Sequence, residues 1–203
     1  MHGVHYIQTL VASAKKSFPK PTKNKHHGRN EEIVIQYIKL IKKWFYMTDI
    51  SFKVPHNYSN IDLLAYDPIK RKYYDIEVKY RSAFTISLTN IKKDKEFSKF
   101  VNQFLRPERA KKTKEIIGEK RPTKIFVTTY RLFGRTKNKR EQIETEFKKK
   151  ILKKGYDCET WYFDEIMQKI FDSVEITGRH NTELIQTIRF IKTFISDKAD
   201  SDK

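Results

Sequence analysis

The sequence has almost no cysteine and no long apolar run. Cys158 is the only cysteine in 203 residues, which excludes an intrachain disulfide and a cysteine-based zinc site. A chain without disulfides is typical of a reducing compartment, so we expect a cytoplasmic protein. No apolar run approaches the ~18 residues that a bilayer-spanning helix needs. The first residues also lack the basic region and apolar core of a signal peptide.

Acidic residues are scarce relative to basic ones. The chain has 25 Asp and Glu against 43 Lys and Arg, a formal net charge of +18. Such an excess of one sign repels itself in a compact fold. A polyanion relieves the repulsion, because each phosphate that the protein neutralises releases condensed counterions. The composition therefore indicates a nucleic-acid partner, with an anionic membrane surface as the alternative.

The length fits one domain with additions at its ends. Residues 1–29 contain no acid, and their basic stretch predicts a flexible arm that lies on phosphate backbones through Lys23, Lys25 and Arg29. We expect residues 30–173 to form the core domain and residues 174–203 to add a C-terminal helix and tail.

Hydrophobic periodicity predicts an α/β fold. The expected elements are a helix at 31–46, strands at 50–54, 60–66 and 72–80, helical stretches between 91 and 118, a strand at 124–133, a helix at 138–154, a strand at 157–163, a helix at 164–172 and a last helix from 182. A three-strand meander followed by crossovers implies a mixed central sheet flanked by helices on both faces.

The second and third predicted strands bring two acids together. If these strands form an antiparallel hairpin with Tyr66 opposite Tyr73, every later pair is fixed. Asp62 then faces Glu77, with Cβ atoms ~5 Å apart. Opposed carboxylates destabilise a sheet, so folding alone does not favour this pair. A shared Mg²⁺ ion reverses the interaction, because Mg²⁺ binds oxygen ligands.

Lys79 lies on the same strand face as Glu77. Its ammonium group could stabilise negative charge on a phosphate, or position and deprotonate an attacking water. The structural alternative is a surface hairpin in which Lys79 only neutralises a carboxylate. We therefore predict that Asp62, Glu77 and Lys79 form a catalytic cluster.

The spacing of these residues resembles a known nuclease signature. Ile61 and Asp62, then fourteen intervening residues, then Glu77, Val78 and Lys79 are similar to the PD-(D/E)XK motif, with Ile61 in place of the frequent proline. This resemblance implies a restriction-endonuclease-like αβββαβ core with C-terminal helical additions.

The preceding helix adds to the resemblance. Glu31 and Glu32 follow Gly28, similar to the N-terminal helix of archaeal Holliday junction resolvases and related nucleases. In that family a helix glutamate helps to complete the metal site. We assign Glu32 to this role, while Glu31 serves the helix dipole; the reverse assignment stays open.

The family resemblance also implies a reaction. Asp62 and Glu77 would bind the metal with the backbone carbonyl of Val78, and Lys79 would assist the water. The expected reaction is hydrolysis of a DNA phosphodiester by water bound to Mg²⁺, for which Mn²⁺ should substitute. We expect no other small-molecule cofactor.

Other residues are candidates for DNA contact. Arg81 and Ser82 follow the strand of Lys79 and could touch the scissile strand's backbone, or could be ordinary strand-end residues. Lys92 and Lys93 could track phosphates, or could form a solvated helix face. A homodimer is implied by analogy, because junction resolvases cut two symmetric strands and a two-fold dimer matches that symmetry.

The leading hypothesis is a DNA endonuclease, either general or selective for branched structures. The alternative is a non-catalytic nucleic-acid-binding protein on the same scaffold, which would show salt-dependent binding without cleavage. A peripheral membrane protein would need a broad exposed apolar helix face. Each predicted helix has only a narrow apolar stripe, of the width that packs on a protein core, so we expect no membrane partner.

Overall fold

The computed structural model describes residues 28–80, 95–118, 121–179 and 182–201. In chain order the elements are α2 (Arg29–Tyr37), the π-helix η1 (Ile38–Lys42), β1 (Phe45–Val54), β2 (Asn57–Asp67), β3 (Lys72–Lys79), α3 (Lys95–Phe104), α4 (Pro107–Ile117), β4 (Thr123–Thr128), α5 (Tyr130–Phe133), α6 (Lys137–Leu152), β5 (Cys158–Tyr162), α7 (Phe163–Ser173) and α8 (Glu183–Ser201). Within these ranges no helix has both the length and the apolar content to cross a membrane.

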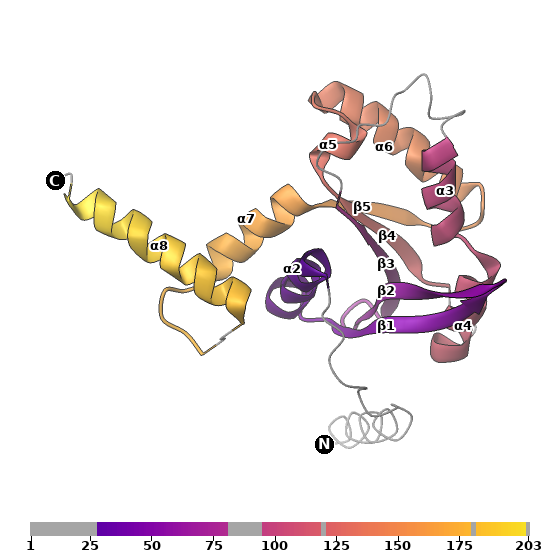
Figure 1. Cartoon of the computed structure of the whole chain (residues 1–203), viewed down its shortest axis with the longest axis horizontal. Coiled ribbons are helices and arrows are strands. Elements are labelled where there is room, and N and C mark those ends of the chain that lie inside the picture. Colours follow the sequence, from indigo (N-terminus) through magenta and orange to yellow (C-terminus); the bar gives the residue numbers. More distant parts are fainter. Residues whose placement is uncertain (1–27, 81–94, 119–120, 180–181, 202–203) are drawn as a thin grey trace, which may run out of the picture.

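The strands form one mixed sheet in the order β1-β2-β3-β4-β5 (Figure 1). The first three strands are antiparallel neighbours, whereas β4 runs parallel to β3 and β5 runs parallel to β4. Parallel neighbours require crossover connections, and the helices supply them. The expected mixed sheet with flanking helices is confirmed.

Helices cover both faces of the sheet (Figure 1). On one face, α2, α7 and α8 pack on a core cluster that includes Ile76 and Ile125. On the other face, α3, α5 and α6 bury aromatic residues around Phe126. Helix α4 closes the same second face over β1 and β2. Full burial of each such aliphatic or aromatic side chain contributes about 1.5–3 kcal/mol.

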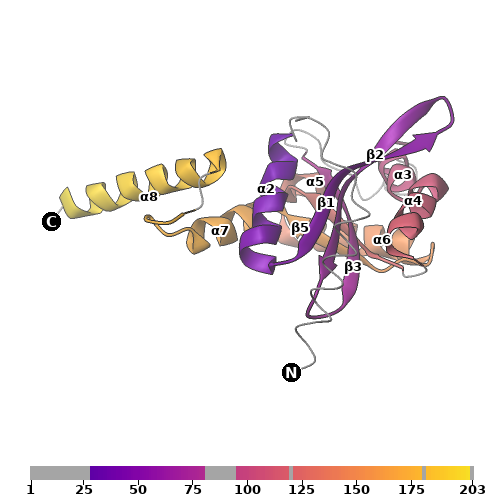
Figure 2. The same cartoon turned by 90° about the horizontal axis from the view of Figure 1, so that it is seen from below.

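The β2–β3 hairpin has the register expected from the sequence. Tyr66 lies opposite Tyr73, and the pairing continues to Leu63 opposite Ile76. The N-terminal part of β2 pairs with β1 alone, and these two strands continue as a hairpin beyond the sheet (Figure 2). Asp62 therefore lies where β2 leaves β3.

The first helix ends earlier than we expected. Its helical backbone stops at Lys42, and Lys43 adopts a left-handed conformation with φ 55°. The predicted helix over 31–46 was wrong at this end, because Phe45 and the next residue pair with β2 and start β1 there. Trp44 then stacks on Tyr74, with ring centroids 4.3 Å apart.

The fourth strand is also shorter than the predicted strand at 124–133. Strand β4 ends at Thr128, and the chain turns into α5. An alternating strand would place Leu132 and Phe133 on opposite faces. The helical turn buries both in one cluster, and the Tyr130 N–H donates to the Asp164 carboxylate.

Candidate functional site

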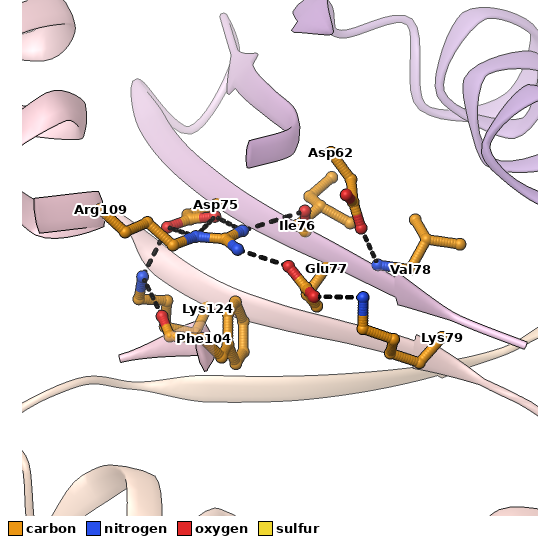
Figure 3. A network of polar contacts seen from close by, with 9 residues as sticks. All are labelled: Asp62, Asp75, Ile76, Glu77, Val78, Lys79, Phe104, Arg109 and Lys124. Carbon is orange, nitrogen blue, oxygen red and sulfur yellow. Dashed lines mark hydrogen bonds and ion pairs between the residues drawn. The ribbon is translucent and has the colours of Figure 1, made fainter. Parts of the chain in front are cut away.

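Asp62 is tied to β3 at the point where the two strands separate. One of its carboxylate oxygens accepts a hydrogen bond of 2.7 Å from the Val78 backbone N–H (Figure 3). This bond satisfies a backbone donor near the last cross-strand pair, Leu63 with Ile76. The side chain of Asp62 therefore has a fixed position beside the strand that carries Glu77 and Lys79.

The environment of Asp62 opposes its ionisation. Burial and the nearby negative charge of Glu77 raise the pKa of Asp62 from 3.8 to about 7. The Val78 hydrogen bond and the positive charges of Lys79 and Arg109 oppose this rise without cancelling it. The two carboxyl groups thus interact, although the β2–β3 ladder ends at Leu63 and Ile76, one residue before the direct pair of Asp62 with Glu77 that we expected.

Glu77 is held between two cations. Its side chain is 6% exposed, and one oxygen lies 2.7 Å from the Lys79 ammonium. The other oxygen accepts a hydrogen bond from the Arg109 guanidinium. Burial alone would lower the pKa of Lys79, but the attraction of Glu77 and its hydrogen bond outweigh burial and raise it. Lys79 therefore stays protonated at neutral pH.

A buried ion network adjoins this cluster (Figure 3). Asp75 is fully buried and contacts the Arg109 guanidinium and the Lys124 ammonium, each at 2.5 Å. Burial alone would raise the pKa of Asp75, but these two cations outweigh it and lower the pKa. Lys124 also donates to the Phe104 carbonyl at 3.2 Å. The network joins β3, β4 and the two helices α3 and α4.

Sequence reasoning missed Arg109 and Lys124. Arg109 lies in a helical segment with many charged residues, a pattern that indicates solvent exposure, yet the residue is only 2% exposed. Lys124 is the second residue of β4 and precedes its apolar residues, and its position opposite Asp75 in the parallel β3–β4 ladder explains the ion pair. A lysine in an otherwise apolar strand was the available signal, since such a charge is buried only with a partner.

The predicted catalytic cluster and the adjoining ion network together have balanced charges. Three acids, Asp62, Asp75 and Glu77, lie among three cations. The cations are Lys79, Arg109 and Lys124. With Asp62 ionised the sum is neutral; with Asp62 protonated one positive charge is in excess. The site therefore has no need of a metal for charge balance, although a metal would favour the ionised form of Asp62.

Glu32 does not lie in this cluster. Its carboxylate accepts a hydrogen bond of 2.5 Å from the Gln36 amide, one turn further along the helix, while the Glu31 carboxylate lies against Gly28. Helix α2 packs on the sheet face opposite to Glu77. Among the residues that the structure describes, no group of three or more Asp, Glu, His or Cys side chains is arranged to hold a metal ion.

The donor set of the cluster still fits a divalent ion. Asp62 and Glu77 offer carboxylate oxygens, which are the ligands that Mg²⁺ and Mn²⁺ prefer. Both oxygens of Glu77 already accept hydrogen bonds from Lys79 and Arg109. A carboxylate has about four acceptor positions, so these ion pairs do not use up its capacity.

Among the predicted DNA-contacting residues, only Arg29 is described by the structure. Arg29 is the first residue of α2. The remaining ones lie outside the described residues: Lys23, Lys25, Arg81, Ser82, Lys92 and Lys93.

Comparison with known proteins adds no relative. No family model matches the chain, and no curated protein or solved structure matches it. The resemblance to PD-(D/E)XK nucleases therefore rests on the residues of β2 and β3 alone, and membership of that family stays a hypothesis.

Proposed function

We propose that this protein is a metal-dependent nuclease that hydrolyses DNA phosphodiester bonds on a restriction-endonuclease-like core. The observation that carries the proposal is the pair of Asp62 and Glu77. Burial and Glu77 raise the pKa of Asp62 to about 7, so an ionised Asp62 opposes folding at neutral pH. Such an arrangement is typical of a functional site, where a bound cation restores the ionised form.

The chain's own residues have distinct roles in this proposal. Asp62 and Glu77 would hold Mg²⁺ or Mn²⁺, which when bound acidifies a water and neutralises phosphate charge. The Val78 N–H orients Asp62, and Arg109 orients Glu77 by holding one of its oxygens. The protonated Lys79 would stabilise negative charge that develops on the phosphate, in preference to acting as a base.

A second candidate is a nucleic-acid-binding protein without catalysis. It is favoured by one observation: Lys79 and Arg109 already neutralise Glu77, and Arg109 and Lys124 already neutralise Asp75. In this case the cluster is a structural ion network. Both candidates share a partner, because the net charge of +18 favours a polyanion.

Cleavage assays separate the two candidates. Linear, branched, single-stranded and circular DNA should be cut with Mg²⁺ or Mn²⁺ and left intact in EDTA. We expect Lys79→Ala to slow cutting by about 100-fold, the lower range for loss of a positioned proton-donor or charge-stabilising group, with DNA binding retained. Lys53→Ala, an exposed lysine of β1, is the matched control and should cut at the wild-type rate.

The same assays can also contradict the nuclease proposal. DNA binding without any metal-dependent cutting would favour the non-catalytic candidate. Cutting that persists in Lys79→Ala and in Asp62→Asn would disprove the site assignment. Paired symmetric cuts in a branched substrate would support a homodimer, which stays a prediction of the family resemblance.

A further inference from the structure

The turn between β2 and β3 has a fixed backbone and exposes the apolar side chain of Ile69 to solvent. The Asp67 carboxylate is buried and accepts hydrogen bonds from the backbone N–H groups of Ile69, at 2.9 Å, and Lys70, at 3.0 Å. Pro68 restricts its own φ angle, and Arg71 adopts a left-handed backbone with φ 52°. The Ile69 side chain is nevertheless 90% exposed. We name residues 67–72 the β2–β3 tip.

The β2–β3 tip is strongly cationic. Lys70, Arg71 and Lys72 are consecutive, and the Lys72 ammonium lies 5.9 Å from the centre of the Tyr74 ring. In the described part of the chain neither Lys70 nor Arg71 forms an ion pair. Neighbouring like charges repel each other, so folding does not favour them. A polyanion at the tip would.

The β2–β3 tip extends from the strands that carry the candidate active site. From Asp62 to Asp67 the strand advances about 17 Å at ~3.3 Å per residue. A DNA strand rises ~3.4 Å per base, so a duplex at the site would reach the tip about five base pairs away. Tyr66 and Tyr73 pack on each other between the two places, with ring centroids 4.7 Å apart, and stiffen this connection.

We propose that the β2–β3 tip binds duplex DNA, with Ile69 inserted from the minor groove between two bases and with Lys70 and Arg71 on the flanking phosphates. A single exposed isoleucine is ordinary on a protein surface. Here it stands on a fixed backbone beside two unpaired cations, which is the composition of an apolar wedge. Such wedges partly unstack a base step and kink the duplex, while phosphate contacts set their position.

This inference rests on the proposed nucleic-acid partner, but not on cleavage, so every measurement is made in EDTA. A duplex series with 2-aminopurine at successive positions brightens where a base is unstacked. We expect the wild-type protein to brighten one position and Ile69→Ala to lose that signal. Ile176→Ala, an equally apolar residue that is 50% exposed beyond α7, is the matched control and should keep the signal.

The charges are tested by the salt dependence of binding. Lys70→Ala combined with Arg71→Ala should reduce the slope of log affinity against log salt by about 2, since each lost phosphate contact removes ~0.9. Ile69→Ala should keep the wild-type slope, because isoleucine contacts no phosphate. Lys169→Ala combined with Arg179→Ala, two exposed cations on and after α7, should also keep it.

Two results would overturn the inference. One is a wild-type slope and wild-type 2-aminopurine signal in all of the tip variants. The other is loss of binding to phosphatidylserine vesicles by the tip variants with DNA binding unchanged, which would assign the tip to an anionic lipid surface. A protein that never cuts DNA but shows the expected tip effects would support the tip and refute only the nuclease.

Discussion

Replacing Arg109 by methionine is expected to lower the free energy of unfolding by about 3–5 kcal/mol, the usual effect of removing one partner of a buried ion pair. The guanidinium is 2% exposed and contacts Asp75 and Glu77. Methionine fills much of the space but leaves Asp75 with Lys124 as its remaining cation, and Glu77 with Lys79. Urea unfolding at neutral pH, followed by circular dichroism, measures the change.

A second substitution tests the cause. Adding Glu77→Gln to Arg109→Met should recover part of the lost stability, because Glu77 has then lost one of its two cations, and its remaining partner Lys79 is 28% exposed and stays hydrated. The matched control is Lys112→Met on the same helix, whose ammonium pairs with Glu115 at 3.0 Å in solvent. That variant should change stability by less than about 0.5 kcal/mol. A loss below about 1 kcal/mol in Arg109→Met would contradict a structural role for the network.

The geometry of the β2–β3 hairpin could be predicted because two local signals agree. Alternation in β3 places Asp75, Glu77 and Lys79 on one face and the apolar residues on the other, and the structure shows the same division. The turn at Asp67 then sets which residues lie opposite each other. A hairpin whose periodicity and turn agree has one register, since a slip by one residue would move every side chain of β2 to the opposite face of the sheet.

The ion network could not be predicted because its partners are distant in the chain. Arg109 is 34 residues from Asp75, and Lys124 is 49 residues from it. Periodicity reports which face a residue occupies, not which residue meets it there. The same gap explains Glu32: the helical pattern groups it with Gln36, as observed, but cannot say which face of the sheet α2 covers.

The end of the first helix was also mispredicted because it depends on contacts between residues that are distant in the chain. Trp44 and Phe45 continue the apolar spacing of the preceding helix, so the local pattern favours a longer helix. Pairing of Phe45 with Tyr66 and stacking of Trp44 on Tyr74 favour an extended chain instead. A sequence pattern that fits both structures leaves the choice to contacts that form only in the folded protein.

Asp62→Asn is expected to abolish cleavage and at the same time to stabilise the metal-free protein, by an amount that grows from about pH 4 and is complete above about pH 7. The pKa of Asp62 rises from 3.8 to about 7 on folding, so the folded state holds the proton more tightly than the unfolded state. Stability is therefore greatest below the lower pKa and is lost as pH rises through the window between the two. Asparagine is neutral throughout, and its amide oxygen can accept the Val78 hydrogen bond.

The gain has an upper limit set by the same shift. At about 1.4 kcal/mol per pKa unit, Asp62→Asn should stabilise the metal-free protein by at most about 4 kcal/mol at pH 8. It should change little near pH 4. Urea unfolding in EDTA across this range measures both. Asp157→Asn replaces an exposed carboxylate and should follow the wild-type pH dependence.

Metal addition should then separate a binding site from a merely strained one. Mg²⁺ should stabilise the wild-type protein above pH 7, because a ligand that binds only the folded state adds its binding free energy. It should have little effect on Asp62→Asn, which lacks one of the two carboxylates. If Asp62→Asn is neither more stable without metal nor less active with it, the pair with Glu77 has no role as a metal site. If the variant is more stable and inactive, the buried carboxylate of Asp62 opposes folding and is retained for the chemistry.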